Sequence, residues 1–157
     1  MSNNLDIEER IDNMILNSDP TTSNDIVDLY RDTTYDEELT EEQKIYGTYY
    51  ICPSDSKTRI GKIGYSTSGN IFYVIRDEYR NKGFGFQALS ALFQYLSMNN
   101  AKGATIFIAK DNTPSIRLAE KIKEVFPIYK QIDSDNGKYV IYNYNISKEL
   151  NENHKIK

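Results

Sequence analysis

The stretch "EYRNKGFGFQAL", Glu78 to Leu89, decides the fold. It places Gly83 and Gly85 directly after the strand-like segment "IFYVI" and directly before a helical pattern. Glycine lets backbone N–H groups converge on a phosphate with no Cβ in the way, and a helix N-terminus adds attraction for an anion. The same glycines would also serve in a tight turn that binds nothing, so the spacing alone leaves both interpretations open.

Two common phosphate-binding loops do not fit this stretch. A Walker loop needs the pattern GxxxxGK followed by serine or threonine, which the sequence lacks. A dinucleotide-binding fingerprint needs a third glycine, which would fall at Ala88. A pyrophosphate cradle of another kind is the interpretation that remains for a phosphate ligand.

The segments before the stretch predict helices and then an antiparallel sheet. Apolar residues recur with a helical period from Ile7 to Ile15, and Ile26, Leu29 and Tyr30 suggest a second short helix. No strand is expected before these helices. From residue 45 the pattern changes to three consecutive strands, which read "IYGTYYIC", "RIGKIGYS" and "NIFYVIR".

The segments after the stretch predict further helices and strands. The helix that begins in the stretch is expected to end near Gly103, and "ATIFIA" is typical of a buried strand. A second helix is expected from Pro114, with Thr113 as its N-cap, to the stop at Pro127, and a β-hairpin follows. The strand, helix, strand order implies a parallel crossover whose helix begins where a strand ends, which is where anions bind.

Charge is distributed unevenly along the chain. Residues 1–44 hold 13 acidic and 3 basic side chains, whereas the remainder is basic, and the whole chain carries a net charge of −4. This division suggests that different surfaces meet ligands of opposite charge, although solvated helix faces would give the same pattern.

Cysteine, histidine and targeting patterns limit the class of protein. Cys52 is the single cysteine, so it cannot form an internal disulfide, and we expect it to pack in the core. His154 is the single histidine and falls in a polar tail, which leaves no Ser/His/Asp or Cys/His catalytic set and no metal site. The N-terminal residues lack a secretory pattern, and no run approaches the roughly 18 apolar residues of a membrane span. We therefore expect a cytoplasmic protein without a metal or a membrane contact.

Two segments together resemble a known family. "IRDEYRNKGFGFQAL" resembles the acetyl-CoA signature of the GNAT superfamily of N-acetyltransferases, with Arg80, Gly83 and Gly85 as its RxxGxG pattern. "DNTPSIRLAEKI" resembles the second motif of that family, in which Asn112 is followed three residues later by Ser115. The motifs fall at the matching strand and helix, the order of elements also matches, and the resemblance covers residues 45–146.

The resemblance implies a fold and a domain organisation. The fold is mixed α/β (α+β), with a mostly antiparallel central sheet, a fourth and a fifth strand that splay apart, and flanking helices. Residues 1–157 would form one GNAT-like domain. Within it, residues 1–44 would be an acidic helical segment on the acceptor side, residues 45–146 an acetyl-CoA-binding core, and residues 147–157 a polar tail.

The resemblance also implies which residues bind acetyl-CoA, the co-substrate. The last three residues of the segment "NIFYVIR", which matches the fourth strand of the family, would offer backbone groups to the pantetheine arm. The glycine-rich turn would hold the pyrophosphate. The Asn and Ser of the second motif would hydrogen-bond the pantetheine or phosphate arm from the other side. Taken singly, the charges of the turn also fit a solvated surface, and the Asn and Ser also fit a helix cap. The expected acetyl-CoA-binding residues are Val74, Ile75, Arg76, Arg80, Asn81, Lys82, Gly83, Phe84, Gly85, Phe86, Asn112 and Ser115.

In this fold the amine attacks the thioester directly, in a ternary complex. The resemblance places the oxyanion donor at a backbone N–H near Ile75. Many family members carry a tyrosine general acid seven residues after the Asn, where this chain has Ala119. Water, another tyrosine or direct release of the thiolate is left for that step. The candidates for a catalytic base are Tyr73, Glu78 and a carboxylate of the acidic N-terminal segment.

The acceptor side of this fold is built largely by the N-terminal segment. Its acidity predicts a cationic primary amine, such as a polyamine, an aminoglycoside-like compound, a lysine side chain or a basic N-terminus. The same acidity argues against a nucleic-acid partner, which needs a basic track. The sequence leaves a homodimer open. The alternative function is a non-catalytic acyl-CoA-binding sensor or interaction module of the same fold.

Overall fold

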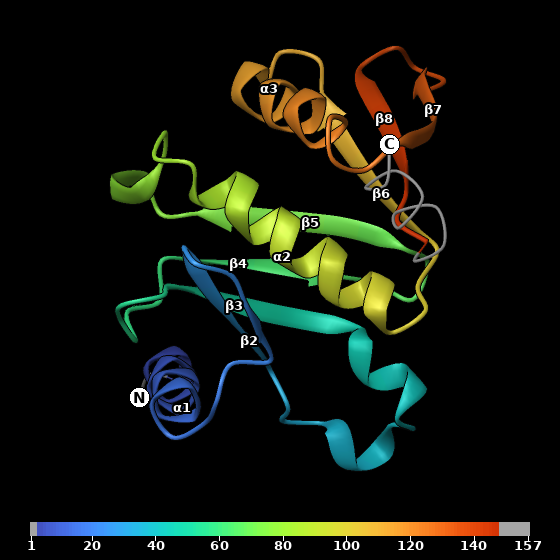
Figure 1. The fold of residues 1–157 in the computed structure, drawn as a ribbon. Coiled ribbons are helices and arrows are strands. Elements are labelled where there is room, and N and C mark those ends of the chain that lie inside the picture. Colours follow the sequence, from blue (N-terminus) through green and yellow to red (C-terminus); the bar gives the residue numbers. More distant parts are fainter. Residues whose placement is uncertain (1–2, 148–157) are drawn as a thin grey trace.

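An eight-stranded, mostly antiparallel sheet lies at the centre of the molecule (Figure 1). The structure is a computed structural model that describes residues 3–147. The strands lie in the order β1-β2-β3-β4-β5-β6-β8-β7, with α1 packed on one face of the sheet and α2 and α3 on the other. The elements are α1 Asn3–Leu16, β1 Thr22–Ser23, β2 Val27–Arg31, β3 Gly47–Pro53, β4 Gly61–Tyr65, β5 Asn70–Ile75, α2 Phe84–Met98, β6 Gly103–Ala109, α3 Thr113–Ile122, β7 Ile128–Asp133 and β8 Tyr139–Asn145.

The parallel pair β5 and β6, which α2 connects, opens at one end. The two strands pair only at Asn70 with Thr105 and at Ile71 with Ile106. Beyond Ile71 the pairing ends, so the strands separate toward Ile75, at the end of β5 from which the chain continues to α2. β5 and β6 are the predicted strands "NIFYVIR" and "ATIFIA", which match the fourth and the fifth strand of the family. The predicted fold, a mixed and mostly antiparallel sheet with a splayed pair and flanking helices, is confirmed.

The main core lies between the sheet and the helices α2 and α3. Side chains alternate along each strand, so one set faces these helices and is buried with them. In this layer Phe93 of α2 packs edge-to-face against Phe126 and tilts against Tyr144 of β8, with ring centroids 5.3 Å apart in both pairs. The strand residues of this core are Val27, Leu29, Tyr49, Ile51, Ile63, Tyr65, Ile71, Ile75, Ala104, Ile106, Ile108, Val140, Tyr142 and Tyr144.

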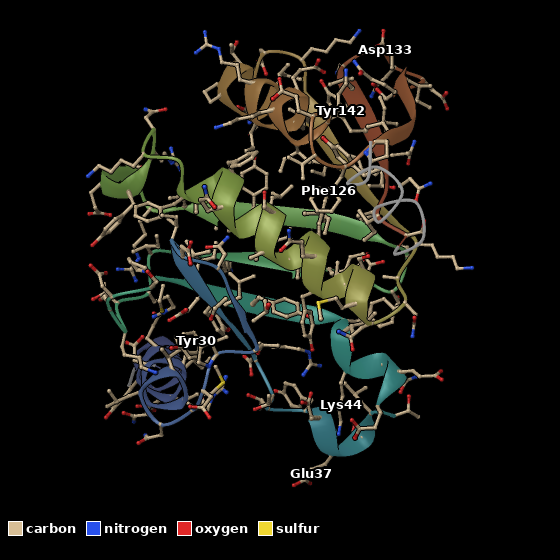
Figure 2. The ribbon with its side chains drawn as sticks, in the orientation of Figure 1. Tyr30, Glu37, Lys44, Phe126, Asp133 and Tyr142 are labelled. Carbon is tan, nitrogen blue, oxygen red and sulfur yellow. The ribbon has the colours of Figure 1, made fainter. Side chains whose placement is uncertain are left out.

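A second, smaller core holds α1 against the opposite face of the sheet. Ile11 and Ile15 of α1 are buried against Tyr30, Tyr50 and Cys52 of β2 and β3. Figure 2 shows Tyr30 beside α1. The predicted first helix is therefore confirmed, and Cys52 is a packing residue, as expected. Burial raises the pKa of its thiol to about 11, which keeps it protonated and unreactive near neutral pH.

The prediction of a second helix around residues 26–30 is wrong, because the strand β2 runs from Val27 to Arg31. Leu29 and Tyr30 are both buried although they are neighbours in sequence, since they face the cores on opposite sides of the sheet. Burial on both faces makes Leu29 and Tyr30 adjacent apolar residues, while Ile26, the third residue of the apparent helical pattern, is exposed and precedes the strand. β2 pairs along its whole length with β3, so a strand does precede the three that the sequence predicts.

The predicted helix boundaries also change. α2 ends at Met98, and Asn100 takes a left-handed conformation with φ 71°, whereas Gly103, the predicted end, begins β6. At α3 the cap is Asn112 rather than Thr113, because the Asn112 side chain accepts a hydrogen bond from the Ser115 N–H at 3.3 Å. α3 ends at Ile122, before Pro127.

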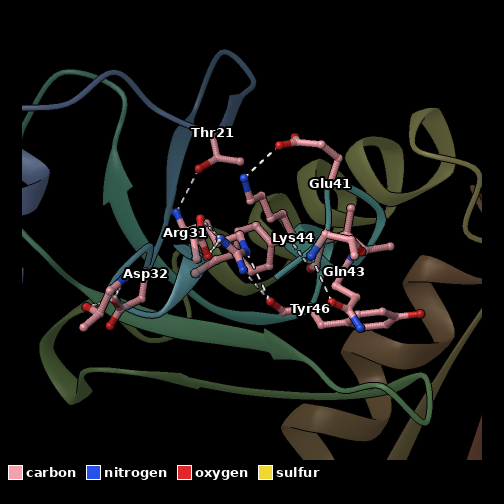
Figure 3. Close-up of polar contacts among 12 residues, drawn as sticks. Thr21, Arg31, Asp32, Glu41, Gln43, Lys44 and Tyr46 are labelled. Atoms are coloured by element: carbon pink, nitrogen blue, oxygen red, sulfur yellow. Dashed lines mark hydrogen bonds and ion pairs between the residues drawn. The ribbon is translucent and has the colours of Figure 1, made fainter. Parts of the chain in front are cut away.

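The acidic segment between β2 and β3 is held at the end of the sheet opposite to Ile75. Buried Arg31 donates to both carboxylate oxygens of Asp36 at 2.6 and 2.7 Å and to the Tyr46 carbonyl at 2.9 and 3.1 Å (Figure 3). Two short 3-10 turns, Asp36–Glu38 and Glu42–Ile45, form this segment, and Figure 2 shows Glu37 and Lys44 there. The following strand β3 begins opposite Tyr65, whereas Ile75 lies opposite Gly61 at the other end of β4. Most of the acids of residues 32–44 are therefore remote from the opening between β5 and β6.

Candidate active site

A first cavity of about 590 Å³ lies on the α2 and α3 face of the sheet. Three elements surround it: the end of β5, the turn that leads into α2, and the start of α3. Thus the glycine-rich stretch and the NxxS segment, about 30 residues apart in sequence, line one cavity. Its lining residues are Tyr73, Val74, Ile75, Tyr79, Arg80, Asn81, Gly83, Phe84, Gly85, Phe86, Asn112, Pro114, Ser115, Arg117, Leu118 and Lys121.

The turn between β5 and α2 is fixed by Arg80. Its Nε donates to the Ile75 carbonyl at 2.9 Å, and its guanidinium pairs with Asp77 at 2.9 Å. The turn then passes through left-handed conformations at Asn81, with φ 62°, and Gly83, with φ 87°. No side chain caps α2. Its first N–H groups are consequently available to a ligand in the first cavity.

The two glycines of the motif have different physical causes. A Cβ on Gly83 would meet nothing within 4 Å, so space is not the constraint there and the positive φ is. A Cβ on Gly85 would lie 3.3 Å from Leu118 Cδ2, so this glycine lets α2 approach α3 closely. The space above Gly83 is open to a phosphate, which fits the pyrophosphate cradle expected from the sequence.

Tyr73 and Ser115 connect β5 to the start of α3 inside the first cavity. The Tyr73 hydroxyl donates a hydrogen bond to Ser115 Oγ at 2.8 Å. Burial raises the pKa of the Tyr73 hydroxyl, and the hydrogen bond with Ser115 opposes that effect only in part. The hydroxyl therefore keeps its proton at neutral pH, which suits a proton donor better than a base.

Five lining residues were not predicted, namely Tyr79, Pro114, Arg117, Leu118 and Lys121. Arg117 and Lys121 add two cations to the α3 side of the first cavity, and Lys121 Nζ lies 4.2 Å from the centroid of the Phe86 ring. The sequence does contain a signal for these two residues. They are four residues apart in a predicted helix, which places them on one face, and they follow the NxxS motif directly.

A second cavity of about 720 Å³ lies on the opposite, α1 face of the sheet. It shares Val74, Ile75 and Arg80 with the first cavity, so the two meet at the end of β5 from opposite sides. Helix α1 forms one wall and the ends of β4 and β5 form the other. Its lining residues are Ile7, Glu8, Ile11, Tyr50, Arg59, Gly61, Lys62, Val74, Ile75, Arg76, Asp77, Glu78 and Arg80.

The structure divides the predicted site residues between these places. Ten of the twelve residues expected to bind acetyl-CoA line the first cavity, and so does Tyr73. Arg76 and Glu78 line the second cavity instead. Lys82 is in the lining of neither cavity, and its Nζ lies 5.9 Å from the centroid of the Tyr79 ring. The polar tail with His154 lies outside the described residues, apart from its first position, 147.

A comparison with family models identifies the class of protein. Residues 7–123 match the model described as "Acetyltransferase (GNAT) domain". The match spans most of the chain, so the chain belongs to the GNAT acetyltransferase family and is an acyltransferase. Members of this family use acetyl-CoA as co-substrate.

Solved structures share the fold at low sequence identity. An acetyltransferase from Agrobacterium tumefaciens has a TM-score of 0.60 at 13% identity and covers 82% of this chain and 95% of its own. A ribosomal L7/L12 alpha-N-protein acetyltransferase has a TM-score of 0.54 at 16% identity, with 68% and 73% covered. The spermidine/spermine N-acetyltransferase of Vibrio cholerae has a TM-score of 0.53 at 14% identity, with 77% and 74% covered. A comparison with curated proteins gave no match.

Two further properties concern the described residues only. None of their helices combines the length and the apolar character that crossing a membrane requires. Within residues 3–147, no group of three or more His, Cys, Asp or Glu side chains is arranged to hold a metal ion.

Proposed function

We propose that this protein is an N-acetyltransferase that moves the acetyl group of acetyl-CoA to a primary amine by direct attack in a ternary complex. The observation that carries the proposal is the meeting of two cavities at Val74 and Ile75, one on each face of the sheet. Acetyl-CoA in the first cavity and the amine in the second would place the two reacting groups against the same strand end.

Residues of the first cavity fit the parts of coenzyme A. The uncapped N-terminus of α2 and the open space above Gly83 suit the pyrophosphate, with Arg117 and Lys121 as nearby cations. The end of β5 and Asn112 with Ser115 would flank the pantetheine arm. The Asn112 side chain already accepts a hydrogen bond from the Ser115 N–H, so Asn112 also has a structural role as the cap of α3.

The backbone of β5 offers a donor for the developing oxyanion. The Arg76 N–H donates to the Ile60 carbonyl, and the Val74 carbonyl also lies on the β4 side, beside Gly61. Because N–H groups alternate along a strand, the N–H of Ile75 points the other way, toward β6, where pairing has ended. This N–H is therefore the proposed oxyanion donor.

Tyr73 and Glu78 are the proposed proton-transfer groups. Glu78 lies in the second cavity, where it would receive the proton of the attacking amine directly or through water. The C–S bond then breaks, and Tyr73 in the first cavity would protonate the leaving thiolate. This assignment changes the expected role of Tyr73 from base to acid. It also supplies the group that is missing at Ala119, which is buried and whose carbonyl accepts a hydrogen bond from Tyr144 at 2.7 Å.

Initial-velocity kinetics test the proposal. Purified protein should release CoA thiol from acetyl-CoA only when an amine is present, with intersecting double-reciprocal plots, since no covalent intermediate forms. A matched Cys52→Ser variant should behave alike. Parallel plots, or loss of activity in that variant, would indicate a ping-pong route through the cysteine.

Coenzyme A binding with no amine-dependent release would instead favour the alternative, a non-catalytic acyl-CoA-binding module.

Several other expectations stay predictions: a cationic acceptor, a homodimer, the lack of a nucleic-acid partner, and a cytoplasmic location. Of the acids in residues 1–44, only Glu8 lines the second cavity. The acceptor must therefore be judged from the charges of that cavity.

A further inference from the structure

The second cavity contains more positive than negative side chains. Four cations line it, Arg59, Lys62, Arg76 and Arg80, against the three carboxylates of Glu8, Asp77 and Glu78. A site for a simple polycation would show the opposite balance.

Two of the cations are occupied by carboxylates. Arg59 pairs with Glu8 and, at 3.2 Å, with Asp12, and these pairs tie α1 to the start of β4. Arg80 pairs with Asp77 and donates to the Ile75 carbonyl. These contacts neutralise Glu8 and Asp77 as sites for a ligand cation.

Three charges of the second cavity remain without an ion pair among residues 3–147: Lys62, Arg76 and Glu78. The two cations act on the cavity, as the neighbouring Glu8 shows. The pKa of its carboxyl is lowered, first by the hydrogen bond and charge of Arg59 and then by the charges of Arg76 and Lys62. One negative and two positive groups are thus left for a ligand.

The strand register places the two free cations side by side. Lys62 of β4 lies opposite Val74 of β5, and Arg76 follows Val74 by two residues, so both side chains leave the sheet on the α1 face. Glu78 lies in the 3-10 turn Asp77–Tyr79, immediately beyond Arg76. The second cavity therefore offers two cations that can bind an anion, Lys62 and Arg76, beside the carboxylate of Glu78. Val74, which lines both cavities, lies between this group of charges and the first cavity.

We propose that the acceptor is a zwitterion, a primary amine with a carboxylate a few bonds away, whose carboxylate binds Lys62 and Arg76 while its ammonium group approaches Glu78. Two sources share this chemistry, a free amino acid and a peptide with an acidic N-terminal residue. A polyamine would bring its second positive charge against the two cations and would be disfavoured. The inference rests on the proposed function, because it assigns the amine to the second cavity.

Matched acceptor pairs test this selectivity. Free amino acids are compared with their carboxamides, peptides that begin with aspartate are compared with peptides that begin with asparagine, and spermidine serves as the polycation. The expected result is that the carboxylate-bearing member of at least one pair has a kcat/KM higher by about fivefold or more, the effect of about 1 kcal/mol for one accessible ion pair. The pair that shows the effect identifies the source.

Variants connect the selectivity to the two cations. Lys62→Gln and Arg76→Gln should each raise KM for the carboxylate-bearing acceptor by about fivefold and leave KM for acetyl-CoA unchanged. The matched control is Lys102→Gln, an exposed lysine just before β6 at the far end of the sheet. Equal kcat/KM within every pair, a preference for spermidine, or unchanged KM in both variants would overturn the inference.

Binding of the product separates this inference from the proposed function. With CoA present, N-acetyl amino acids or N-acetylated peptides of the preferred pair should bind at least about fivefold more tightly than their uncharged counterparts, and Lys62→Gln should remove the difference. This calorimetric readout needs no turnover. Selective binding without transfer would contradict the acetyltransferase proposal alone, whereas transfer without carboxylate selectivity would contradict the zwitterion alone.

Discussion

Tyr73 brings a protonated hydroxyl into the first cavity from β5. Its ring packs against the main core, and its hydroxyl donates to Ser115, the small residue of the second motif. In the position where a tyrosine is common in this family the chain has buried Ala119, so the proton donor would come from the sheet instead of from the helix.

Tyr73→Phe should lower kcat by about 10² and change the affinity for CoA little, because it removes a proton donor but keeps the ring. Stopped-time thiol assays and calorimetric CoA titration measure the two effects. Tyr95→Phe is the matched control, since Tyr95 lies on α2 against the core and lines neither cavity. A kcat equal to that of the unmodified protein would exclude Tyr73 as the acid and leave water or unassisted thiolate release.

Local motifs place most of the expected acetyl-CoA-binding residues around the first cavity, whereas the lining of the second cavity depends on contacts that are distant in sequence. The turn from Arg80 to Phe86 and the pair Asn112 and Ser115 lie close in sequence, so their spacing carries the geometry. Arg76 was expected to offer its backbone to the pantetheine arm, and its side chain lines the second cavity because the two-residue period of a strand turns it away from Ile75. Glu8 and Arg59 meet across 51 residues, and no local pattern predicts such a contact.

The two glycines at the start of α2 differ in what they contribute. Gly83, the N-cap, has a left-handed backbone conformation, and Gly85 allows close packing against Leu118 of α3. Gly83→Ala should destabilise the protein by about 1–2 kcal/mol, because alanine resists the left-handed φ, and should weaken CoA binding. Gly85→Ala should change stability by less than about 1 kcal/mol, because the 3.3 Å contact is with the movable end of Leu118 and alanine favours the helix.

Urea unfolding and CoA titration of the two variants check this difference. Each variant serves as the control for the other, since both add one methyl group to the same motif. Equal losses of stability would contradict the separate causes assigned to the two glycines. A loss of CoA affinity in Gly85→Ala alone would indicate that the pyrophosphate binds beside Gly85, inside the first turn of α2, and not beside Gly83.

Most strands and helices of the core were predictable because each has one dominant period of apolar residues. β2 was not, because burial on both faces removes the alternation that marks a strand. Its neighbours also mislead, since the 3-10 turns that follow carry the acidic residues that suggested a helical acceptor segment. Pairing with β3, a contact distant in sequence, decides the conformation.

Ion pairs that involve carboxylates attach α1 to the sheet beside the second cavity. Arg59, which lies just before β4, pairs with Glu8 and Asp12 of α1. Arg10 of α1 has its Nη1 atom 3.7 Å from Asp32 Oδ1. Asp32 also accepts a hydrogen bond from the Tyr50 hydroxyl at 3.0 Å. A helix that forms one wall of the proposed acceptor cavity therefore depends on groups that acid neutralises.

Acid should weaken this attachment in a defined direction. Burial alone would raise the pKa of Asp32, but hydrogen bonds from Thr34 and Tyr50 and the charge of Arg10 outweigh burial, so its folded-state pKa is lowered. The pKa of Glu8 is lowered as well, first by Arg59. A lowered pKa contributes stability that is present above the unfolded value, near 4, and is lost as pH falls toward the folded value. Stability should consequently decline below about pH 4.

Asp32→Asn should make that decline shallower while lowering the unfolding free energy at pH 7 by at most about 1 kcal/mol, since the side chain is partly exposed. Urea unfolding between pH 7 and 3 measures both quantities. Glu37→Gln is the control, because Glu37 is an exposed carboxylate at the far end of the sheet. If the pH dependence of Asp32→Asn matched that of the unmodified protein, Asp32 would not contribute to the acid response, and the attachment of α1 would rest on Arg59 and its two partners.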